Sequence, residues 1–463
     1  MTTSAVVLLA AGAGWALLQR YDGNIDRIGG ALGLSGVDRP ADGSRESTTF
    51  LLVGSDSRDG LAPGEGTQGR GDSFVTGQRA DTIILAHLFA DSEAAQLVSV
   101  PRDAYVTIPA HRDPSTGDVV EERTGKINSS FHDGGPPLLV ATVERMSGVR
   151  VDHYVQVDFT GFKAMVDQLG GVEVCLSEPA REPDSGIDLP AGRQVVAGDQ
   201  ALAFVRQRKG LPRGDIDRIR RQQQFMGAVV RKTLSAGTLL NPLKLNGFLD
   251  AATDSLQVDE DLELSDLRDL ALRMRGADAG AVTFSTVPVA DTAARRGGES
   301  VVLLDEPATV ELFDRIRRDL PPGAPDPEAE PVDDRPLTVE PEEVTVRVFN
   351  GTSRSGLGGD VTRALEDLGF GVAGPPDNRE SSTAATVVLH GRGELESART
   401  VAAAIPGARV QLDPSLDGTV EVVVGASYTG VVVPGVGSPA PAAPTPPAAE
   451  QPVLTAADDV CGL

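Results

Sequence analysis

Short, uninterrupted apolar runs are the first pattern along the chain. Runs of this length are typical of strands in a sheet that is covered on both faces. We expect such strands at residues 49–54, 82–88, 96–100 and 172–176, and an alternating apolar and polar strand at residues 151–159. The pattern therefore predicts a sheet that forms the centre of a domain.

Helical periodicity lies between these strands. Pro136–Pro137 fit the first turn of a helix that runs to Met146. Thr160 is placed to cap a second helix, whose apolar stripe from Phe162 to Leu169 is closed by Gly170–Gly171. Because strands and helices alternate, the chain is expected to have an α/β fold, with a layered α/β/α domain around the sheet.

Changes in composition divide the 463 residues into domains. The first domain is expected over residues 49–320, with a motif-bearing core at 49–235 followed by Leu-rich amphipathic stretches. Residues 321–342 are dense in Pro, Asp and Glu, as in a solvated linker. A smaller α/β domain is expected at 343–430, and the Pro- and Ala-rich residues 431–463 are expected to be disordered.

The N-terminal residues bear on the compartment. Residues Ser4 to Leu18 are apolar and uncharged. A helix of roughly 15 residues spans about 22 Å, which is short of a hydrocarbon core of about 30 Å. We interpret residues 1–20 as part of a membrane anchor, followed by a tether at 21–48, and a cleaved signal peptide is the alternative. Both interpretations place the rest of the chain outside the cytoplasmic membrane.

The chain contains two cysteines, Cys175 and Cys461. A pair alone cannot form a metal site. One interpretation is a buried thiol with a separate thiol in the tail. The other is a disulfide that ties the tail to the first domain, which requires an oxidising compartment.

The formal net charge of −25 argues against nucleic-acid binding, which needs a basic surface. Residues 203–223 reverse this charge locally with a cluster of arginines. An extended backbone would point Arg206 and Arg208 to one face, and a helix would do the same for Arg218 and Gln222. The segment predicts a site for a multiply charged anion such as diphosphate, and a solvated basic helix is the alternative.

Charged residues also stand at the ends of the predicted strands, where α/β sheets place their sites. Two carboxylates at adjacent strand ends suit Mg²⁺, which combines a few carboxylates with substrate phosphates. Each pair alone also fits a surface ion pair. The residues are Asp56, Arg58, Arg79, Asp81, Arg102 and Asp103, with Lys126 and Asn128 in a later loop.

Taken in order, these motifs resemble those of the LytR-CpsA-Psr family. The resemblance covers about residues 48–235, and the segment around Gly356-Leu357-Gly358 is similar to the C-terminal accessory domain of actinobacterial members. The motifs are Val53-Gly54-Ser55-Asp56-Ser57-Arg58, Arg79-x-Asp81-Thr82, Val100-Pro101-Arg102-Asp103, Lys126-x-Asn128, and Arg206-x-Arg208 followed by Asp215-x-x-Arg218-x-x-Arg221-Gln222-Gln223.

The resemblance implies a membrane-anchored phosphotransferase that acts outside the cell. It would move a glycopolymer from a polyprenyl-diphosphate lipid to peptidoglycan through a phosphodiester link. It also implies that Asp56 and Asp81 hold Mg²⁺ with the diphosphate, and that Asp103 orients the arginines. Asp215 is implied either as the base for the acceptor hydroxyl or as a further orienting group. The residues implied to hold the diphosphate are Arg79, Arg102, Arg206, Arg208, Arg218 and Gln222, with Lys126 on phosphate or sugar.

Two other functions compete with this one. A polyprenyl-diphosphate hydrolase would use water in place of the acceptor, and a non-catalytic regulator would bind the lipid diphosphate without reaction. The long segment between Asp56 and Asp81 carries Arg70 and Asp72, whose roles the resemblance does not assign.

Overall fold

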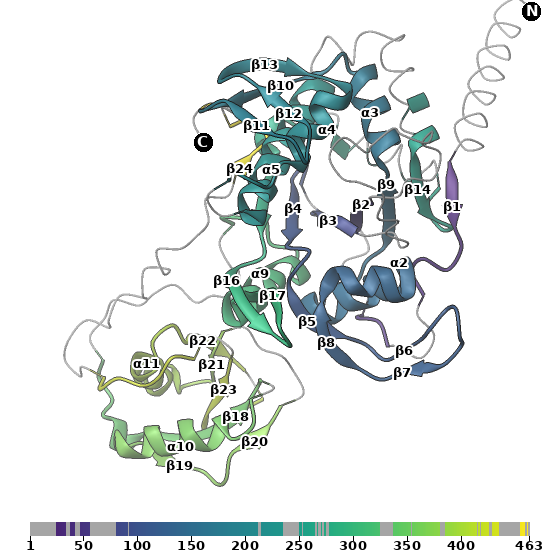
Figure 1. The fold of residues 1–463 in the computed structure, drawn as a ribbon. Coiled ribbons are helices and arrows are strands. Elements are labelled where there is room, and N and C mark those ends of the chain that lie inside the picture. The colour runs from purple at the N-terminus through teal and green to yellow at the C-terminus, as the bar shows by residue number, and fades with distance from the viewer. Residues whose placement is uncertain are drawn as a thin grey trace, which may run out of the picture. The chain divides into compact units, whose positions relative to one another are not determined.

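The computed structural model describes most of the chain in two compact units (Figure 1). One unit comprises the residues up to Leu304 together with those from Pro452 onward, and the other is Asp305–Gln451. The division falls at residue 304, earlier than the expected domain end at 320. The described residues are 25–33, 38–41, 47–55, 80–90, 92–211, 214–234, 250–251, 253–263, 266, 270, 273–274, 277–324, 337–352, 354–379, 385–413, 415–416, 418–425, 428–434, 454–458 and 461.

A mixed eight-stranded sheet forms the centre of the first unit, with the strand order β1-β14-β9-β2-β3-β4-β15-β24. Strand β2 pairs in parallel with β9 and antiparallel with β3, and β4 pairs in parallel with β15. The fold is therefore α/β with a mixed sheet, as the sequence predicts. The strands are β1 (Asp26–Ile28), β2 (Thr48–Ser55), β3 (Ala80–Leu88), β4 (Ala95–Val100), β9 (His153–Val157), β14 (Leu256–Asp259), β15 (Val282–Thr286) and β24 (Leu454–Thr455).

Helices cover the sheet. All residues of β3 from Ile83 to Leu88 are buried, so both faces of this strand are shielded from water. Helix α5 (Asp215–Leu234) places Met226 and Val230 against the cluster that contains Phe284 of β15. Helix α2 (Ile127–Ser147) contacts β3. Burial of a continuous apolar sheet between helices is the main source of stability in this architecture.

Helix α2 contains a break that the prolines explain. Gly135 has a φ of 64° inside the element, and Pro136 and Pro137 begin the segment that follows. Proline fits a first turn because its missing N–H needs no partner there. The prediction of a helix opened by Pro136–Pro137 is confirmed, although a further helical segment precedes it from Ile127.

Two further helices, a 3₁₀ turn and several short hairpins complete the described part of this unit. Asp158, not Thr160, caps α3, because its side chain accepts a hydrogen bond from Gly161 N at 2.7 Å. Residues up to Arg206 are helical, so the expectation of an extended backbone through Arg206 is wrong. The elements are α3 (Phe159–Gln168), α4 (Gly198–Arg206), β5 (Tyr105–Ile108), β6 (His111–Arg112), β7 (Val119–Val120), β8 (Arg123–Lys126), β10 (Val172–Leu176), β11 (Ala180–Glu182), β12 (Ile187–Leu189), β13 (Gly192–Val196), the 3₁₀ turn η2 (Ala279–Ala281), β16 (Val289–Arg296) and β17 (Glu299–Leu304).

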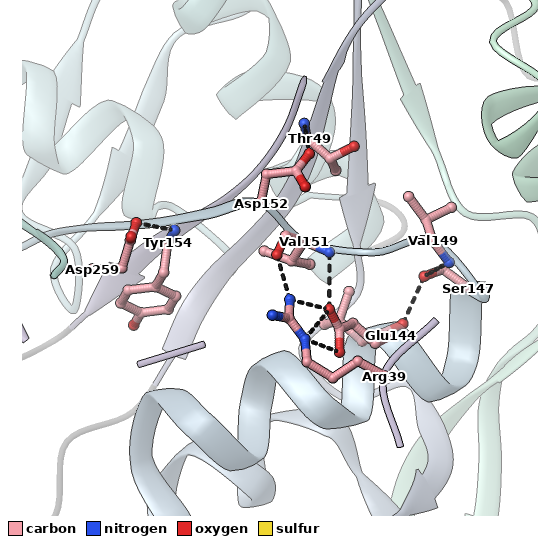
Figure 2. A network of polar contacts seen from close by, with 10 residues as sticks. Arg39, Thr49, Glu144, Ser147, Val149, Val151, Asp152, Tyr154 and Asp259 are labelled. Atoms are coloured by element: carbon pink, nitrogen blue, oxygen red, sulfur yellow. Dashed lines mark hydrogen bonds and ion pairs between the residues drawn. The ribbon is translucent and has the colours of Figure 1, made fainter. Parts of the chain in front are cut away.

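A buried ion pair joins the segment before β2 to helix α2 (Figure 2). The Glu144 carboxylate is 4% exposed and accepts two hydrogen bonds from Arg39 Nε, each 3.1 Å long. It also accepts from Val151 N at 2.9 Å, just before β9. Because a buried carboxylate is stable only when its oxygens are satisfied, this network fixes the end of α2 against β9.

The second unit is a smaller α/β domain around a six-stranded sheet. Helices α10 and α11 contribute to one apolar cluster with the strands, through Leu357, Val361, Ala398 and Val401. The elements are α9 (Glu306–Arg317), η3 (Pro341–Glu343), β18 (Thr345–Asn350), α10 (Leu357–Asp367), β19 (Gly371–Val372), β20 (Asp377–Asn378), β21 (Val387–His390), α11 (Leu395–Ala404), β22 (Arg409–Leu412) and β23 (Val420–Val424).

The C-terminal residues return to the first unit. Leu454–Thr455 pair antiparallel with β15, and Cys461 forms a disulfide with Cys175 of β10. The expectation of a disordered tail over residues 431–463 is therefore wrong at its end. An apolar tail strand finds a partner at the open edge of the sheet, and unpaired sheet edges favour such pairing.

The expected anchor at residues 1–20 lies outside the described residues, as do Arg70 and Asp72. Among the helices that the structure describes, none combines the length and the apolar character that crossing a membrane requires.

We predict that the disulfide contributes substantially to stability, because it joins residues 286 positions apart and so restricts the unfolded chain. Replacing both Cys175 and Cys461 by Ala should lower the free energy of unfolding by about 2–5 kcal/mol in urea titrations. Reductant should destabilise the unsubstituted protein by a similar amount and leave the double variant unchanged. Equal unfolding of the unsubstituted protein with and without reductant would contradict this.

An ion pair between β9 and β14 makes stability depend on pH. His153 Nδ1 lies 3.3 Å from Asp259 Oδ2, and Asp259 also accepts from Tyr154 N and Asp261 N. Burial alone would lower the pKa of His153, but the Asp259 carboxylate raises it above 6.5. Burial alone would raise the pKa of Asp259, but His153 and the two N–H groups lower it below 3.8.

The two shifts define the pH window in which this pair stabilises the fold. The contribution of His153 is complete below pH 6.5 and is lost as pH rises through its raised folded pKa. The contribution of Asp259 is present above pH 3.8 and is lost as pH falls through its lowered pKa. The free energy of unfolding of the unsubstituted protein should therefore exceed that of a His153→Gln variant by most between pH 3.8 and pH 6.5. This difference should shrink in alkaline solution. A difference that stays constant from acid to alkaline pH in urea titrations would exclude this role.

Candidate active site

Loops and helix ends from distant parts of the first unit meet at one place. Asp81 lies at the start of β3, Arg102 and Asp103 follow β4, and Lys126 ends β8. The N-terminal turns of α5 bring Asp215 and Arg218 to the same place, since both contact Arg102 or its partners. The residues come from four segments of the chain, which is why only the folded sheet can assemble them.

The Asp215 carboxylate is the centre of this cluster. It lies 3.4 Å from Arg102 Nε, 3.3 Å from Arg218 Nη1 and 3.9 Å from Arg208 Nε. Asp215 is the first residue of α5, where a negative charge interacts favourably with the helix dipole. One carboxylate thus gathers three guanidinium groups.

Arg102 connects this centre to the strand ends. Its Nη1 contacts Asp81 Oδ1, and its Nε lies 3.8 Å from Asp103 Oδ2. Burial alone would lower the pKa of Arg102, but the carboxylates of Asp81 and Asp215 outweigh burial and raise it. The guanidinium of Arg102 is therefore held charged between acidic groups.

The network continues from Asp103 to a hairpin. Lys126 Nζ lies 3.4 Å from Asp103 Oδ1 and 3.5 Å from Glu299 Oε2 of β17. Positively and negatively charged side chains alternate along this network. Its order is Glu299, Lys126, Asp103, Arg102, Asp215, and then Arg208 and Arg218, with Asp81 as a second partner of Arg102.

Several buried atoms of the cluster lack a hydrogen-bond partner. Within the described part of the chain, this is true of Arg102 Nε, Arg218 Nε and Asp215 Oδ1. Arg218 is only 7% exposed, and burial lowers its pKa, an effect that Asp215 partly offsets. Buried donors without acceptors are costly, so a ligand with several acceptor oxygens would be stabilised here.

Two successive glutamines dock α5 on the sheet. Gln222 Nε2 donates to Thr82 Oγ1 at 3.1 Å and to Val205 O at 3.3 Å. Gln223 is 4% exposed, and its Nε2 lies 3.2 Å from Ser99 Oγ and 2.9 Å from Ser285 O. Both glutamines thus set the position of α5, and with it the positions of Asp215 and Arg218.

Arg206 and Arg208 leave the end of α4 in different directions. The Arg206 guanidinium stacks over the Phe159 ring at 4.8 Å, whereas Arg208 reaches Asp215 and is half exposed. Arg221 contacts Gln207 Oε1 and lies over the Phe204 ring, which ties the loop to α5. Of the arginines at 206 and 208, the structure brings only Arg208 into contact with the Asp215 cluster.

Two of the expected site residues, Asp56 and Arg79, lie outside the described residues. Within the described ranges, no group of three or more His, Cys, Asp or Glu side chains could hold a metal ion. The assignments of Asp56 and Arg79 stay predictions.

The contact of Glu299 with Lys126 carries no clear signal in the sequence. Glu299 is an exposed carboxylate far along the chain, and nothing in its surroundings indicates the contact with Lys126. The contacts of Gln223 do carry a signal in the sequence, because Ile219, Gln223 and Met226 share the helical spacing of the buried stripe. A glutamine in an apolar stripe indicates a buried polar contact.

Chemically, the cluster offers cationic donors to an anion from two sides. Arg102 and Lys126 approach from the strand ends, Arg208 from the loop after α4, and Arg218 from α5. Guanidinium groups stay charged and bind phosphate oxygens in pairs. The arrangement can bind a multiply charged phosphate and stabilise charge that develops on it.

Comparisons with known proteins find two family matches in this chain. Residues 34–318 match the LytR_cpsA_psr family, and residues 343–428 match the domain described as LytR cell envelope-related transcriptional attenuator. The cell wall biosynthesis protein LcpA of Corynebacterium glutamicum is 33% identical over 454 residues, covering 92% of this chain and 85% of its own.

A second relative and a solved structure are similar over a shorter part. The polyisoprenyl-teichoic acid–peptidoglycan teichoic acid transferase TagU of Bacillus mycoides is 35% identical, covering 44% of this chain and 59% of its own. The crystal structure of B. subtilis TagV is 23% identical with a TM-score of 0.47, covering 60% of this chain and 98% of its own.

The docking of α5 yields a direct prediction. Gln223→Ala should lower the free energy of unfolding by about 1–3 kcal/mol, because the buried hydroxyl and carbonyl groups around it lose their donor. The adjacent, half-buried Gln224 provides a matched control, and its replacement by Ala should change stability by about 0.5 kcal/mol or less. Equal effects of the two substitutions in urea titrations would refute the docking role.

Proposed function

Because the chain belongs to the LytR_cpsA_psr family, we propose that it transfers a glycopolymer from a polyprenyl-diphosphate lipid to peptidoglycan. The product is a phosphodiester link between the glycopolymer and the peptidoglycan. The names of the relatives support this reaction, since one is a cell wall biosynthesis protein and another a teichoic acid–peptidoglycan transferase. The protein is then a phosphotransferase of the cell envelope.

One observation carries the proposal. Three guanidinium groups surround Asp215, and the buried Nε atoms of Arg102 and Arg218 lack hydrogen-bond partners among the described residues. A diphosphate supplies the missing acceptor oxygens. The negative charge of the diphosphate also complements the local excess of cationic side chains on α5.

The reaction requires positioning more than covalent chemistry. The acceptor hydroxyl oxygen forms a bond to the phosphorus next to the glycopolymer, and the bond from that phosphorus to the bridging oxygen breaks. The polyprenyl monophosphate leaves, and the hydroxyl proton ends on this leaving phosphate or in solvent. Arg102, Arg208 and Arg218 stabilise the charge on the phosphoryl oxygens throughout.

The remaining residues hold these arginines in place. Asp215 contacts all three guanidinium groups, so we assign it to orienting them and not to proton removal. Asp103 lies between Arg102 and Lys126, and its negative charge offsets the repulsion between these two cations. Arg206, Arg79 and Gln222 belong to the proposed diphosphate site through the family motifs, with Gln222 also holding α5 against Thr82.

We propose Mg²⁺ as the cofactor, held by Asp81 with Asp56. The Asp81 side chain is 32% exposed, which favours this role. Arg102 contacts its Oδ1 atom, so the carboxylate fits the role only in part. A carboxylate with an accessible oxygen is a ligand that Mg²⁺ prefers. When bound, the ion would supply further neutralisation of the diphosphate charge.

We propose an extracytoplasmic location, anchored to the membrane through the N-terminal residues. The disulfide between Cys175 and Cys461 supports it, because such bonds persist in oxidising compartments. The lipid donor would place the site near the membrane surface.

The function predicts a specific loss of activity. Full-length protein should transfer a labelled glycan from its lipid diphosphate to peptidoglycan, and Arg208→Ala should reduce kcat/KM by about ten- to a hundredfold. Lys209→Ala is the matched control, because the neighbouring Lys209 is engaged with Asp184 instead of Asp215. This control should retain activity within about threefold.

Three outcomes would contradict the proposal. Equal activities of the Arg208→Ala and unsubstituted proteins would exclude the site. Release of lipid monophosphate at a rate that peptidoglycan does not change would indicate a hydrolase. Tight binding of the lipid diphosphate without turnover would indicate a regulator.

A further inference from the structure

The hairpin formed by β16 and β17 is the element that the proposed reaction does not yet use. Its turn, Gly297–Gly298, has positive φ angles of 57° and 88°, which a two-residue hairpin turn requires. Arg296 and Glu299 form the last pair before the turn. The hairpin is thus a short, well-defined projection and not an irregular loop.

Three contacts attach this hairpin to the active-site cluster. Val302 N donates to Asp103 O at 2.9 Å, and Val302 forms a parallel bridge with Ala104. Near the turn, Glu299 Oε2 lies 3.5 Å from Lys126 Nζ. Strand β17 accordingly lies beside β5 (Figure 1). The hairpin therefore runs along the cluster, from Asp103 at Val302 to Lys126 at Glu299 beside the turn.

Two arginines stand at its tip. Arg295 and Arg296 are both exposed, in a chain whose net charge is −25. Arg295 Nη2 donates to Gly298 O and Arg296 Nη1 donates to Arg295 O, each at 3.1 Å. Because a guanidinium has five N–H donors, these bonds orient the side chains and leave them able to bind a further anion.

We propose that Arg295 and Arg296 form a binding subsite for carboxylate groups of the peptidoglycan acceptor. The inference rests on the proposed transfer to peptidoglycan. The peptides of peptidoglycan carry carboxylates, and arginine binds carboxylates through paired N–H donors. The acceptor must extend away from the reacting phosphorus. The hairpin contacts two residues of the cluster, Asp103 and Lys126, and its arginines offer the acceptor cationic groups there.

Glu299 has a separate part in this arrangement. It contacts Lys126 and pairs in register with Arg296, so it links the diphosphate cluster to the tip. Its negative charge keeps Lys126 and the tip arginines from repelling one another. We therefore assign Glu299 as a positioning residue for Lys126.

Kinetics with each substrate varied in turn test the subsite. In the full chain, Arg295→Ala/Arg296→Ala should raise the KM for peptidoglycan by about 5- to 20-fold. The KM for the lipid-linked glycan and kcat at saturating peptidoglycan should stay within about twofold, since the diphosphate contacts are intact. Arg145→Ala/Arg181→Ala removes the same charge from exposed positions of the same unit, with side chains 61% and 81% exposed, and should leave all constants unchanged.

An unchanged KM for peptidoglycan would overturn the subsite, and so would an equal rise in the control variant. A rise in the KM for the lipid-linked glycan instead would show that the tip binds the donor polymer, which also overturns it. Co-sedimentation with purified peptidoglycan without donor separates this inference from the proposed reaction. There the tip variant should bind more weakly than the control variant even if the unsubstituted protein transfers nothing.

Discussion

The interaction between Asp215 and three arginines is the constraint on which the site depends. Like charges at this spacing repel, and the shared Asp215 carboxylate offsets this repulsion among Arg102, Arg208 and Arg218 in a partly buried place. The carboxylate at the first residue of α5 is itself stabilised by the helix dipole. A helix start, a loop and a strand end are thereby joined through one side chain.

The fold supplies the rigidity that this cluster requires. Helix α5 is docked on the sheet through Gln222 and Gln223, so its N-terminus cannot drift from Thr82 and Ser99. Nearer the C-terminus of the same helix, Arg231 contacts the carbonyl of Ala456 in the returning tail. The disulfide then fixes that tail to β10. Groups that bind a charged transition state act best when their positions are set before the substrate arrives.

The sequence predicts much of this arrangement where local rules decide. Helical spacing places Arg218 and Gln222 on one face, and strand ends collect Asp81 and Arg102, as the structure has them. The prediction of an extended backbone at Arg206 was wrong. It relied on the two-residue spacing of Arg206 and Arg208, which fits a strand. The buried residues Ala201 and Phe204 follow helical spacing instead, and tertiary packing made them a helix.

Long-range contacts could not be predicted in the same way. The contact of Glu299 with Lys126 depends on how a hairpin packs more than 150 residues along the chain, and an exposed glutamate carries no periodic signal. The pairing of the two cysteines was one of two interpretations, because sequence does not tell whether a tail returns. Asp56 and Arg79 stay predictions on their motifs.

Calorimetric titration of lipid phosphates tests the central role of Asp215 most directly. The full chain should bind polyprenyl diphosphate about tenfold more tightly than polyprenyl monophosphate, because only the diphosphate reaches all three arginines. The Asp215→Asn variant should lose this preference while it keeps the same fold. Equal affinity of the unsubstituted protein for both lipids, or an unchanged preference in the variant, would contradict the account.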